Sequence, residues 1–147
     1  MTEAEGDSVS LEVTRIVSAP PERVFDAWTR ADELRKWWGP SGVECVAAEI
    51  DLRIGGAYRI ANQLPDQSVL WISGEFIVIE RPHLLVYTWA LEGQEQVAEH
   101  VRVAFENHEL GTSIVVTHTR IASPAIRDQH EHGWAGCLEG IAAHLGT

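Results

Sequence analysis

The chain has 147 residues, of which 45% are hydrophobic and 22% are charged, values typical of one globular domain with a sizeable core. Its net charge of −11 at pH 7 opposes broad phosphate contacts, so neither nucleic acid nor an anionic membrane is an expected partner. No apolar stretch reaches the length of a membrane span, and the N-terminus lacks a signal-peptide core, so we expect a cytoplasmic protein. The two cysteines, Cys45 and Cys137, are far apart and are expected to be reduced thiols.

The first part of the chain predicts a tail, a strand and two helices. Residues 1–7 are small or acidic and are expected to be a disordered tail before a single domain over residues 8–147. Apolar residues alternate along 8–19, as in a half-buried strand. Two short helices are then expected at 20–29, where two prolines suit a helix start, and at 31–38.

Two adjacent tryptophans end the second short helix. Trp37 and Trp38 point about 100° apart on a helix, so a single packing face cannot bury both rings. Gly39-Pro40 ends the helix. We expect one ring to lie in the core and the other to border a cavity opening, and we choose Trp38 for the opening. The alternative is that both rings only pack between the helices and the sheet.

The middle of the chain predicts an antiparallel sheet. Apolar residues alternate with polar ones, and Gly, Pro and Asp residues mark the turns. The short connections between neighbouring strands imply an antiparallel meander. The expected strands lie at 43–51, 56–62, 69–80, 84–91, 99–107 and 112–119.

The last segment predicts one long helix over 124–145, with Ser123 as N-cap and Pro124 as the first helical residue. Its apolar stripe should face the sheet. Glycine inside a helix costs about 1 kcal/mol relative to alanine, so the internal glycines suggest either close packing or retained volume. The stripe residues are Trp134, Leu138, Ile141 and Leu145, and the glycines are Gly133, Gly136 and Gly140.

Several segments resemble, in order, the START-like (SRPBCC) helix-grip superfamily, and within it the group named after the activator of the heat-shock-protein-ninety ATPase. The resemblance implies an α+β helix-grip fold: a curved antiparallel sheet of six to seven strands around a long C-terminal helix, with two short helices after the first strand. The superfamily includes carriers, cyclases, receptors and co-chaperone domains, so the resemblance does not define a function. The segments are "APPERVFDAWT" (19–29), "LRKWWGP" (34–40), "DLRIGGAY" (51–58), "ERPHLLVYTW" (80–89) and "HGW" (132–134).

A helix gripped by a curved sheet leaves room for a cavity, and we assign candidate ligand-binding residues to it. Arg15 and His118 share the parity of apolar neighbours in their strands and should face inward. Arg15 is then either a ligand anchor or part of an internal ion pair with Glu49 or Asp51. The expected lining residues are Trp38, Tyr58, Trp89, Phe105, His118, Trp134 and Leu138.

The first half of the long helix carries polar residues beside its apolar stripe. Extending the stripe backwards places His130, Glu131 and Arg127 on or near the side that faces the sheet. They form either a polar cavity entrance or a part that projects beyond the sheet. We take His130 and Glu131, with Arg15, as possible polar anchors for a ligand.

No sequence motif indicates a cofactor or metal. His130 and His132 diverge on a helix, where metal-ligand pairs need a spacing of three or four residues. GxSxG, P-loop and GxGxxG motifs are absent from the sequence. We therefore assign no catalytic residue, no metal and no cofactor.

The favoured hypothesis is a binding protein for a small apolar or aromatic molecule, held between the sheet and the C-terminal helix. The first alternative is an enzyme of the cyclase or hydrolase type that acts on this ligand, with His118, His130 or Glu131 as acid or base. The second is a co-chaperone-like module with a protein partner, for which an exposed apolar patch around Trp37, Trp38 and Pro40 is expected. The chain is expected to be a monomer or a homodimer.

Overall fold

The structure is a computed structural model that describes residues 9–39, 42–93 and 98–146. The expected tail at 1–7 lies outside these residues, and the domain limits at 8–147 stay a prediction. The element boundaries differ from those expected by at most about two residues. The elements in chain order are β1 (Val9–Val17), α2 (Pro21–Thr29), α3 (Ala31–Trp37), β2 (Glu44–Ile50), β3 (Ala57–Gln63), β4 (Val69–Glu80), β5 (Leu84–Leu91), β6 (Glu99–His108), β7 (Gly111–Ile121) and α4 (Pro124–Leu145).

The strands form one seven-stranded antiparallel sheet in the order β1-β7-β6-β5-β4-β3-β2. The meander from β2 to β7 is the one expected from the short connections. The first strand, β1, forms one edge of the sheet and pairs with the last strand, β7. In this pairing Arg15 lies opposite Ile114 and Val17 opposite Thr112. The predicted helix-grip fold is confirmed.

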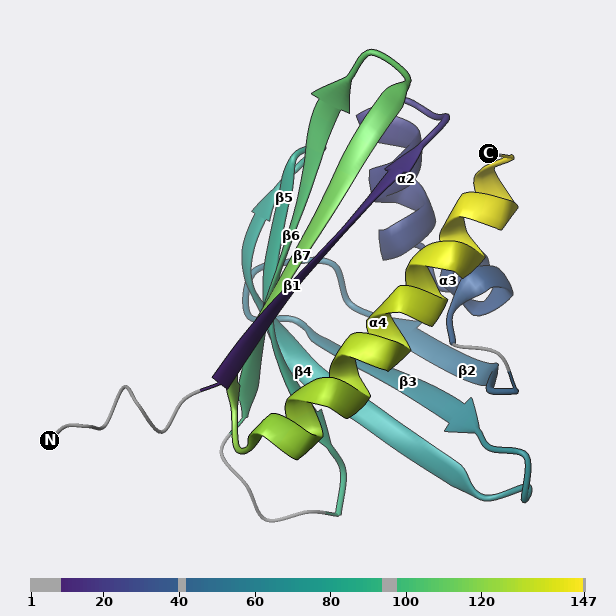
Figure 1. Cartoon of the computed structure of the whole chain (residues 1–147), viewed down its shortest axis with the longest axis vertical. Helices are drawn as coiled ribbons and strands as arrows, with labels where there is room; N and C mark the ends of the chain where they lie inside the picture. The colour runs from purple at the N-terminus through teal and green to yellow at the C-terminus, as the bar shows by residue number, and fades with distance from the viewer. Residues whose placement is uncertain (1–8, 40–41, 94–97, 147) are drawn as a thin grey trace, which may run out of the picture.

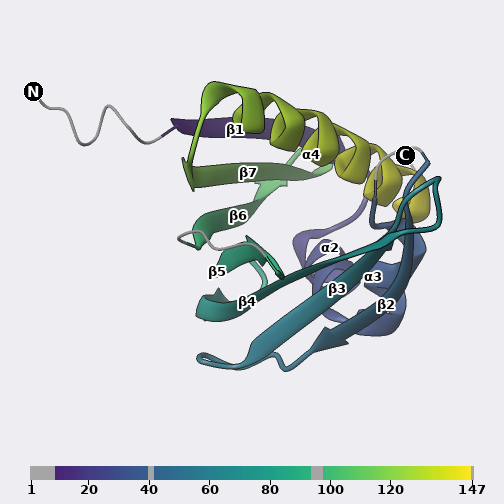
Figure 2. The same cartoon turned by 90° about the horizontal axis from the view of Figure 1, so that it is seen from below.

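The sheet is curved, and Figure 2 shows it curling from β1 at one edge to β2 at the other. The pairing register shifts between Cys45 and Ala47 in β2 and between Phe76 and Val78 in β4. An extra residue in one strand bends that strand and increases the local twist. The bulges therefore help the sheet to wrap around the helices.

Helix α4 lies along the concave side of the sheet beside β1, and its C-terminal end reaches α3 (Figure 1). The side chain of Ser123 accepts a hydrogen bond from the backbone N–H of Ile126, as expected of an N-cap. Gly146 ends the helix with a positive φ of 87°. A Cβ on Gly140 would lie 2.3 Å from the carbonyl oxygen of Trp37. Close packing thus explains Gly140, but the neighbour is the end of α3 and not a strand.

The aromatic core joins the two short helices to α4 and the sheet. The ring of Trp28 contacts Trp37, Trp38 and Trp134, with centroid distances of 5.0, 6.5 and 6.0 Å. Trp37 is 3% exposed and donates its indole N–H to the carbonyl of Ala27 at 2.9 Å. Trp38 is 8% exposed. Both rings of the tryptophan pair are therefore buried.

The cysteines and the hydrophobicity of the helices can also be compared with the sequence. Cys45 and Cys137 are free, buried thiols. Within the described ranges, no helix combines the length and the apolar character needed to cross a lipid bilayer.

Candidate functional site

The larger cavity, here called the main cavity, lies between α4 and strands β3 to β5 and has a volume of about 170 Å³. Its wall is mostly apolar, as is usual for a small-molecule site. Three polar side chains also line it: Asn62, Gln129 and His130. The large apolar lining residues are Trp38, Leu64, Leu70, Ile72, Trp89, Leu91 and Trp134.

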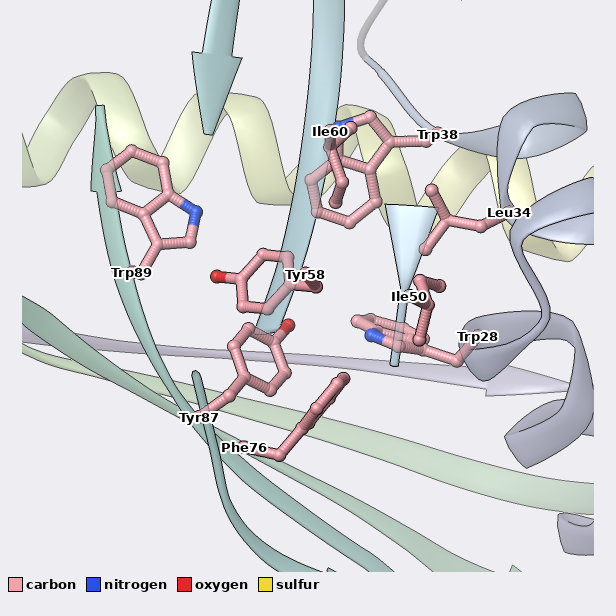
Figure 3. Close-up of a pocket in the computed structure, with 9 residues that line it drawn as sticks. All are labelled: Trp28, Leu34, Trp38, Ile50, Tyr58, Ile60, Phe76, Tyr87 and Trp89. Carbon is pink, nitrogen blue, oxygen red and sulfur yellow. The ribbon is translucent and has the colours of Figure 1, made fainter. Parts of the chain in front are cut away.

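A second, smaller cavity, here called the inner pocket, lies between the two short helices and strands β2 to β5 and has a volume of only about 20 Å³. Figure 3 shows the rings of Tyr58 and Tyr87 in its middle, with Trp89 on one side and Trp28 on the other. Burial raises the pKa of both tyrosines, so their hydroxyl groups stay protonated. Trp38 and Trp89 line both cavities, so these two side chains separate the inner pocket from the main cavity.

A buried polar network borders the main cavity and links β6, β7 and α4. The indole N–H of Trp134 donates to Nδ1 of His118 at 2.9 Å. Nε2 of His118 lies 2.7 Å from Oε1 of Glu99, and Nε2 of His130 lies 3.0 Å from the same oxygen. Glu99 and His118 are 2% and 0% exposed. The network thus places a carboxylate and two imidazoles in the core.

Hydrogen-bond geometry defines where the protons of this network lie. An indole N–H can only donate, so Nδ1 of His118 carries no proton, and Nε2 of His118 donates to Glu99. Burial lowers the pKa of His118, in accord with a neutral ring. Burial raises the pKa of Glu99, but the hydrogen bonds from His118 and His130 outweigh it and lower that pKa to about 2. Glu99 is therefore an anion that accepts two hydrogen bonds.

His130 is held on several sides. Its ring stacks on His118 with centroids 4.7 Å apart and an interplanar angle of 21°, and it meets the Trp89 ring edge-to-face at 4.7 Å. Its Nε2 is occupied by Glu99. Among the described residues, Nδ1 of His130 has no hydrogen-bond partner, and the side chain is 13% exposed. His130 lines the main cavity, and its Nδ1 is the ring nitrogen without a partner among the described residues.

Asn62 contributes a second unpartnered polar atom. Its Oδ1 is the only buried side-chain nitrogen or oxygen without a hydrogen-bond partner in the part of the chain that the structure describes. Asn62 is 8% exposed and lines the main cavity from β3. An unpaired buried amide oxygen costs about 1–3 kcal/mol.

A family model described as "Activator of Hsp90 ATPase homolog 1-like protein" matches residues 18–146. The chain belongs to this family. The match covers both short helices, the strands from β2 to β7 and all of α4. Every residue of the buried network lies inside the matched range. No curated protein matches the chain.

The fold is shared with solved structures of bacterial proteins. Protein CV1439 from Chromobacterium violaceum has a TM-score of 0.86 at 23% identity, over 94% of this chain and 97% of that one. The AHSA1 protein SPO3351 from Silicibacter pomeroyi has a TM-score of 0.82 at 24% identity, over 93% and 97%. Protein Ms6760 from Mycobacterium smegmatis has a TM-score of 0.81 at 21% identity, over 94% and 91%. At these identities the likeness shows the fold alone.

Half of the ten candidate residues predicted from the sequence lie in the walls of the two cavities. Trp38, Trp89, Trp134 and His130 line the main cavity, and Tyr58 lines the inner pocket.

Three of the expected lining residues belong to the core instead of a cavity wall. Phe105 is 0% exposed and packs edge-to-face against Phe25 and Trp28. Leu138 is 3% exposed, and it lines neither described cavity. His118 lies behind His130, within the buried network. Their inward parity was predicted correctly, but neighbouring side chains cover them.

Two of the expected anchors lie away from the cavity. Arg15 is inward by parity, but β1 is an edge strand, so its side chain stays 35% exposed and pairs with Glu139 of α4. The expected partners, Glu49 and Asp51, were wrong. Glu131 forms an ion pair with Arg127 at 2.9 Å, and both side chains are partly exposed. Neither Arg15 nor Glu131 lines either described cavity.

The buried network is also the one group among the described residues that offers three metal-ligand atoms, all within 4.8 Å of one another. Two imidazoles and a carboxylate suit several divalent metals. However, a metal on Nε2 of His118 would move the ring proton to Nδ1, where the N–H of Trp134 already points. Two donors would then face each other. The hydrogen-bonded arrangement fits these residues better than a metal ion does.

Two residues of the site were missed by the sequence interpretation. Glu99 shares the inward parity of Val101 and Val103 on β6, and Asn62 shares that of Tyr58 and Ile60 on β3. A polar residue on the apolar parity of a strand was the available signal. The same signal that identified His118 would also have identified Glu99.

Proposed function

We propose that this chain binds a small, largely apolar or aromatic molecule in the main cavity. The single observation that carries the proposal is the cavity between α4 and the sheet, with three tryptophans and few polar groups in its wall. A volume of about 170 Å³ suits one aromatic ring with a substituent, since cavities of about 150 Å³ take up benzene. The polar side chains of Asn62, Gln129 and His130 in the wall offer such a ligand polar contacts.

Gly133 supports the proposal from the helix side. It lines the main cavity, and a Cβ at this position would meet no atom within 4 Å. Glycine in a helix interior costs about 1 kcal/mol relative to alanine, and close packing does not account for this glycine. Retained volume does account for it, because any larger side chain at Gly133 would occupy the cavity.

The test fills the cavity from this position. Gly133→Leu should abolish binding of a ligand identified by native mass spectrometry of the protein from its own host, or of phenol as a probe. Ala135→Leu, at an exposed position of the same helix, is the matched control and should bind as the wild type does. Equal affinity in Gly133→Leu and the wild type would contradict the proposed site.

Catalysis on the bound molecule is a second candidate function, favoured by the pairing of His130 with Glu99 at the cavity wall. A carboxylate that holds one imidazole nitrogen leaves the other able to take a proton from a bound molecule. Turnover of the identified ligand should then be lost in His130→Gln while binding persists. Binding without any turnover in the wild type would end this candidate.

The protein-interaction alternative depended on an exposed apolar patch at the tryptophan pair. Trp37 and Trp38 are both buried, and Pro40 lies outside the described residues. We therefore place this alternative below ligand binding.

A further inference from the structure

We propose that the main cavity selects an uncharged, largely apolar molecule that donates a hydrogen bond through a hydroxyl or N–H group, with Nδ1 of His130 as the acceptor. This inference rests on the proposed binding function and adds the polarity of the ligand. It also gives the buried network a role, which is to fix His130 in one protonation pattern.

Both ends of the buried network have a fixed hydrogen-bond direction. Trp134 can only donate, and the Glu99 carboxylate can only accept. Between them, His118 has one possible arrangement, with its proton on Nε2. Glu99 in turn requires the proton of His130 to lie on Nε2. In the neutral ring, Nδ1 of His130 is then an acceptor.

The ring of His130 cannot easily turn to direct a different atom toward the main cavity. A flip of the ring would break its bond to Glu99, and the rings of His118 and Trp89 pack against it, each with a centroid distance of 4.7 Å. Glu99, His118 and Trp134 are thus positioning residues. They hold the acceptor of His130 toward the cavity before a ligand arrives, which lowers the ordering cost of binding.

The charge around the main cavity is negative. Among the described residues that line the main cavity, none is a lysine or arginine. The Glu99 carboxylate lies directly behind His130, and the chain carries a net charge of −11. A carboxylate or phosphate ligand would meet a negative field and the acceptor of His130, without a cation to pair with it. The cavity therefore disfavours anions.

The experiment compares three probes that share one aromatic ring: phenol, toluene and benzoate. Phenol offers a donor, toluene replaces it with a methyl group, and benzoate is an anion. Affinities are measured by isothermal titration calorimetry at about pH 8, where an ordinary histidine side chain is neutral. One net hydrogen bond corresponds to a preference for phenol over toluene of about two- to twelvefold. Benzoate should bind more weakly than either.

A variant and a spectroscopic measurement test the role of His130. His130→Phe keeps a ring of similar size but removes the acceptor, so it should bind toluene and lose the preference for phenol. Nitrogen chemical shifts of the isotope-labelled wild type should show the Nε2–H form for both His118 and His130. The second measurement needs no variant, so it decides the question even where His130→Phe does not fold.

The outcomes separate this inference from the binding function. If toluene binds as tightly as phenol, or benzoate binds most tightly, the ligand polarity is wrong and the cavity function stands. If none of the three probes binds, the binding function fails and this inference with it. An Nδ1–H form of His130, or tight binding of Zn²⁺ that shifts the ring nitrogens of both histidines, would also overturn it.

Discussion

Trp134 of α4 donates its indole N–H to Nδ1 of His118 in β7 at 2.9 Å, inside the core. This bond joins the long helix to the sheet, and Trp134 also lines the main cavity. It also sets the protonation pattern of the imidazole that it contacts, because an indole N–H has no acceptor capacity.

The bond between Trp134 and His118 should contribute measurably to stability. Trp134→Phe removes the donor and leaves Nδ1 of His118 unpaired, which should lower the free energy of unfolding by about 1–3 kcal/mol, in addition to the effect of the smaller ring. A double-mutant cycle with His118→Phe isolates the pair, and a coupling of about 0.5–3 kcal/mol is expected from urea unfolding. A coupling of zero would mean that the two side chains do not interact in solution.

The buried network predicts an acid-sensitive stability. The pKa of His118 is below its ordinary 6.5, so the unfolded chain takes up a proton at a higher pH than the folded chain does. The stability from a neutral His118 is therefore complete above about pH 6.5 and declines as the pH falls below it. Glu99, with its pKa lowered from 4.5 to about 2, adds a second loss between those two values.

Unfolding free energies of the wild type and His118→Asn across this range measure the contribution of His118. The advantage of the wild type should narrow as the pH drops below about 6.5, since asparagine does not titrate. A difference that stays constant down to acid pH would contradict a buried neutral histidine.

Two glycines of α4 should respond in opposite ways to alanine. Gly133→Ala adds a methyl group in open space, so the higher helix propensity of alanine should stabilise the protein by up to about 1 kcal/mol. Gly140→Ala places Cβ 2.3 Å from the carbonyl oxygen of Trp37, and the clash should outweigh the gain. Thermal unfolding of the two variants provides the comparison, in which each is the control for the other. Stabilisation by both would show that α4 and α3 do not pack as closely as described.

The adjacent tryptophans should separate into a packing residue and a ligand contact. Trp37→Phe loses the hydrogen bond to Ala27 and should lower the free energy of unfolding by about 0.5–1.5 kcal/mol, with little effect on phenol binding. Trp38→Phe, beside both cavities, should change phenol affinity. Calorimetric titration of both variants decides between them. Identical phenol affinity in Trp38→Phe and the wild type would leave the tryptophan pair as packing alone.

The fold could be predicted from the sequence because it depends on local patterns. Alternation with a period of two, turn residues and the Ser123-Pro124 start of α4 each act over a few residues. The same parity placed His118 on the inner face, and the helical stripe placed Trp134 and His130 toward the sheet. These assignments need only the direction of a side chain relative to its own strand or helix.

The site depended on contacts between elements far apart in the chain. Glu99, His118 and His130 come from β6, β7 and α4, and no spacing in the sequence predicts that their side chains meet at one carboxylate oxygen. Arg15 shows the same limit, because its parity was clear but its exposure followed from the place of β1 at the sheet edge. Side-chain direction is a local property of a strand or helix, whereas burial, hydrogen-bond partners and cavities arise only when the sheet curls around α4.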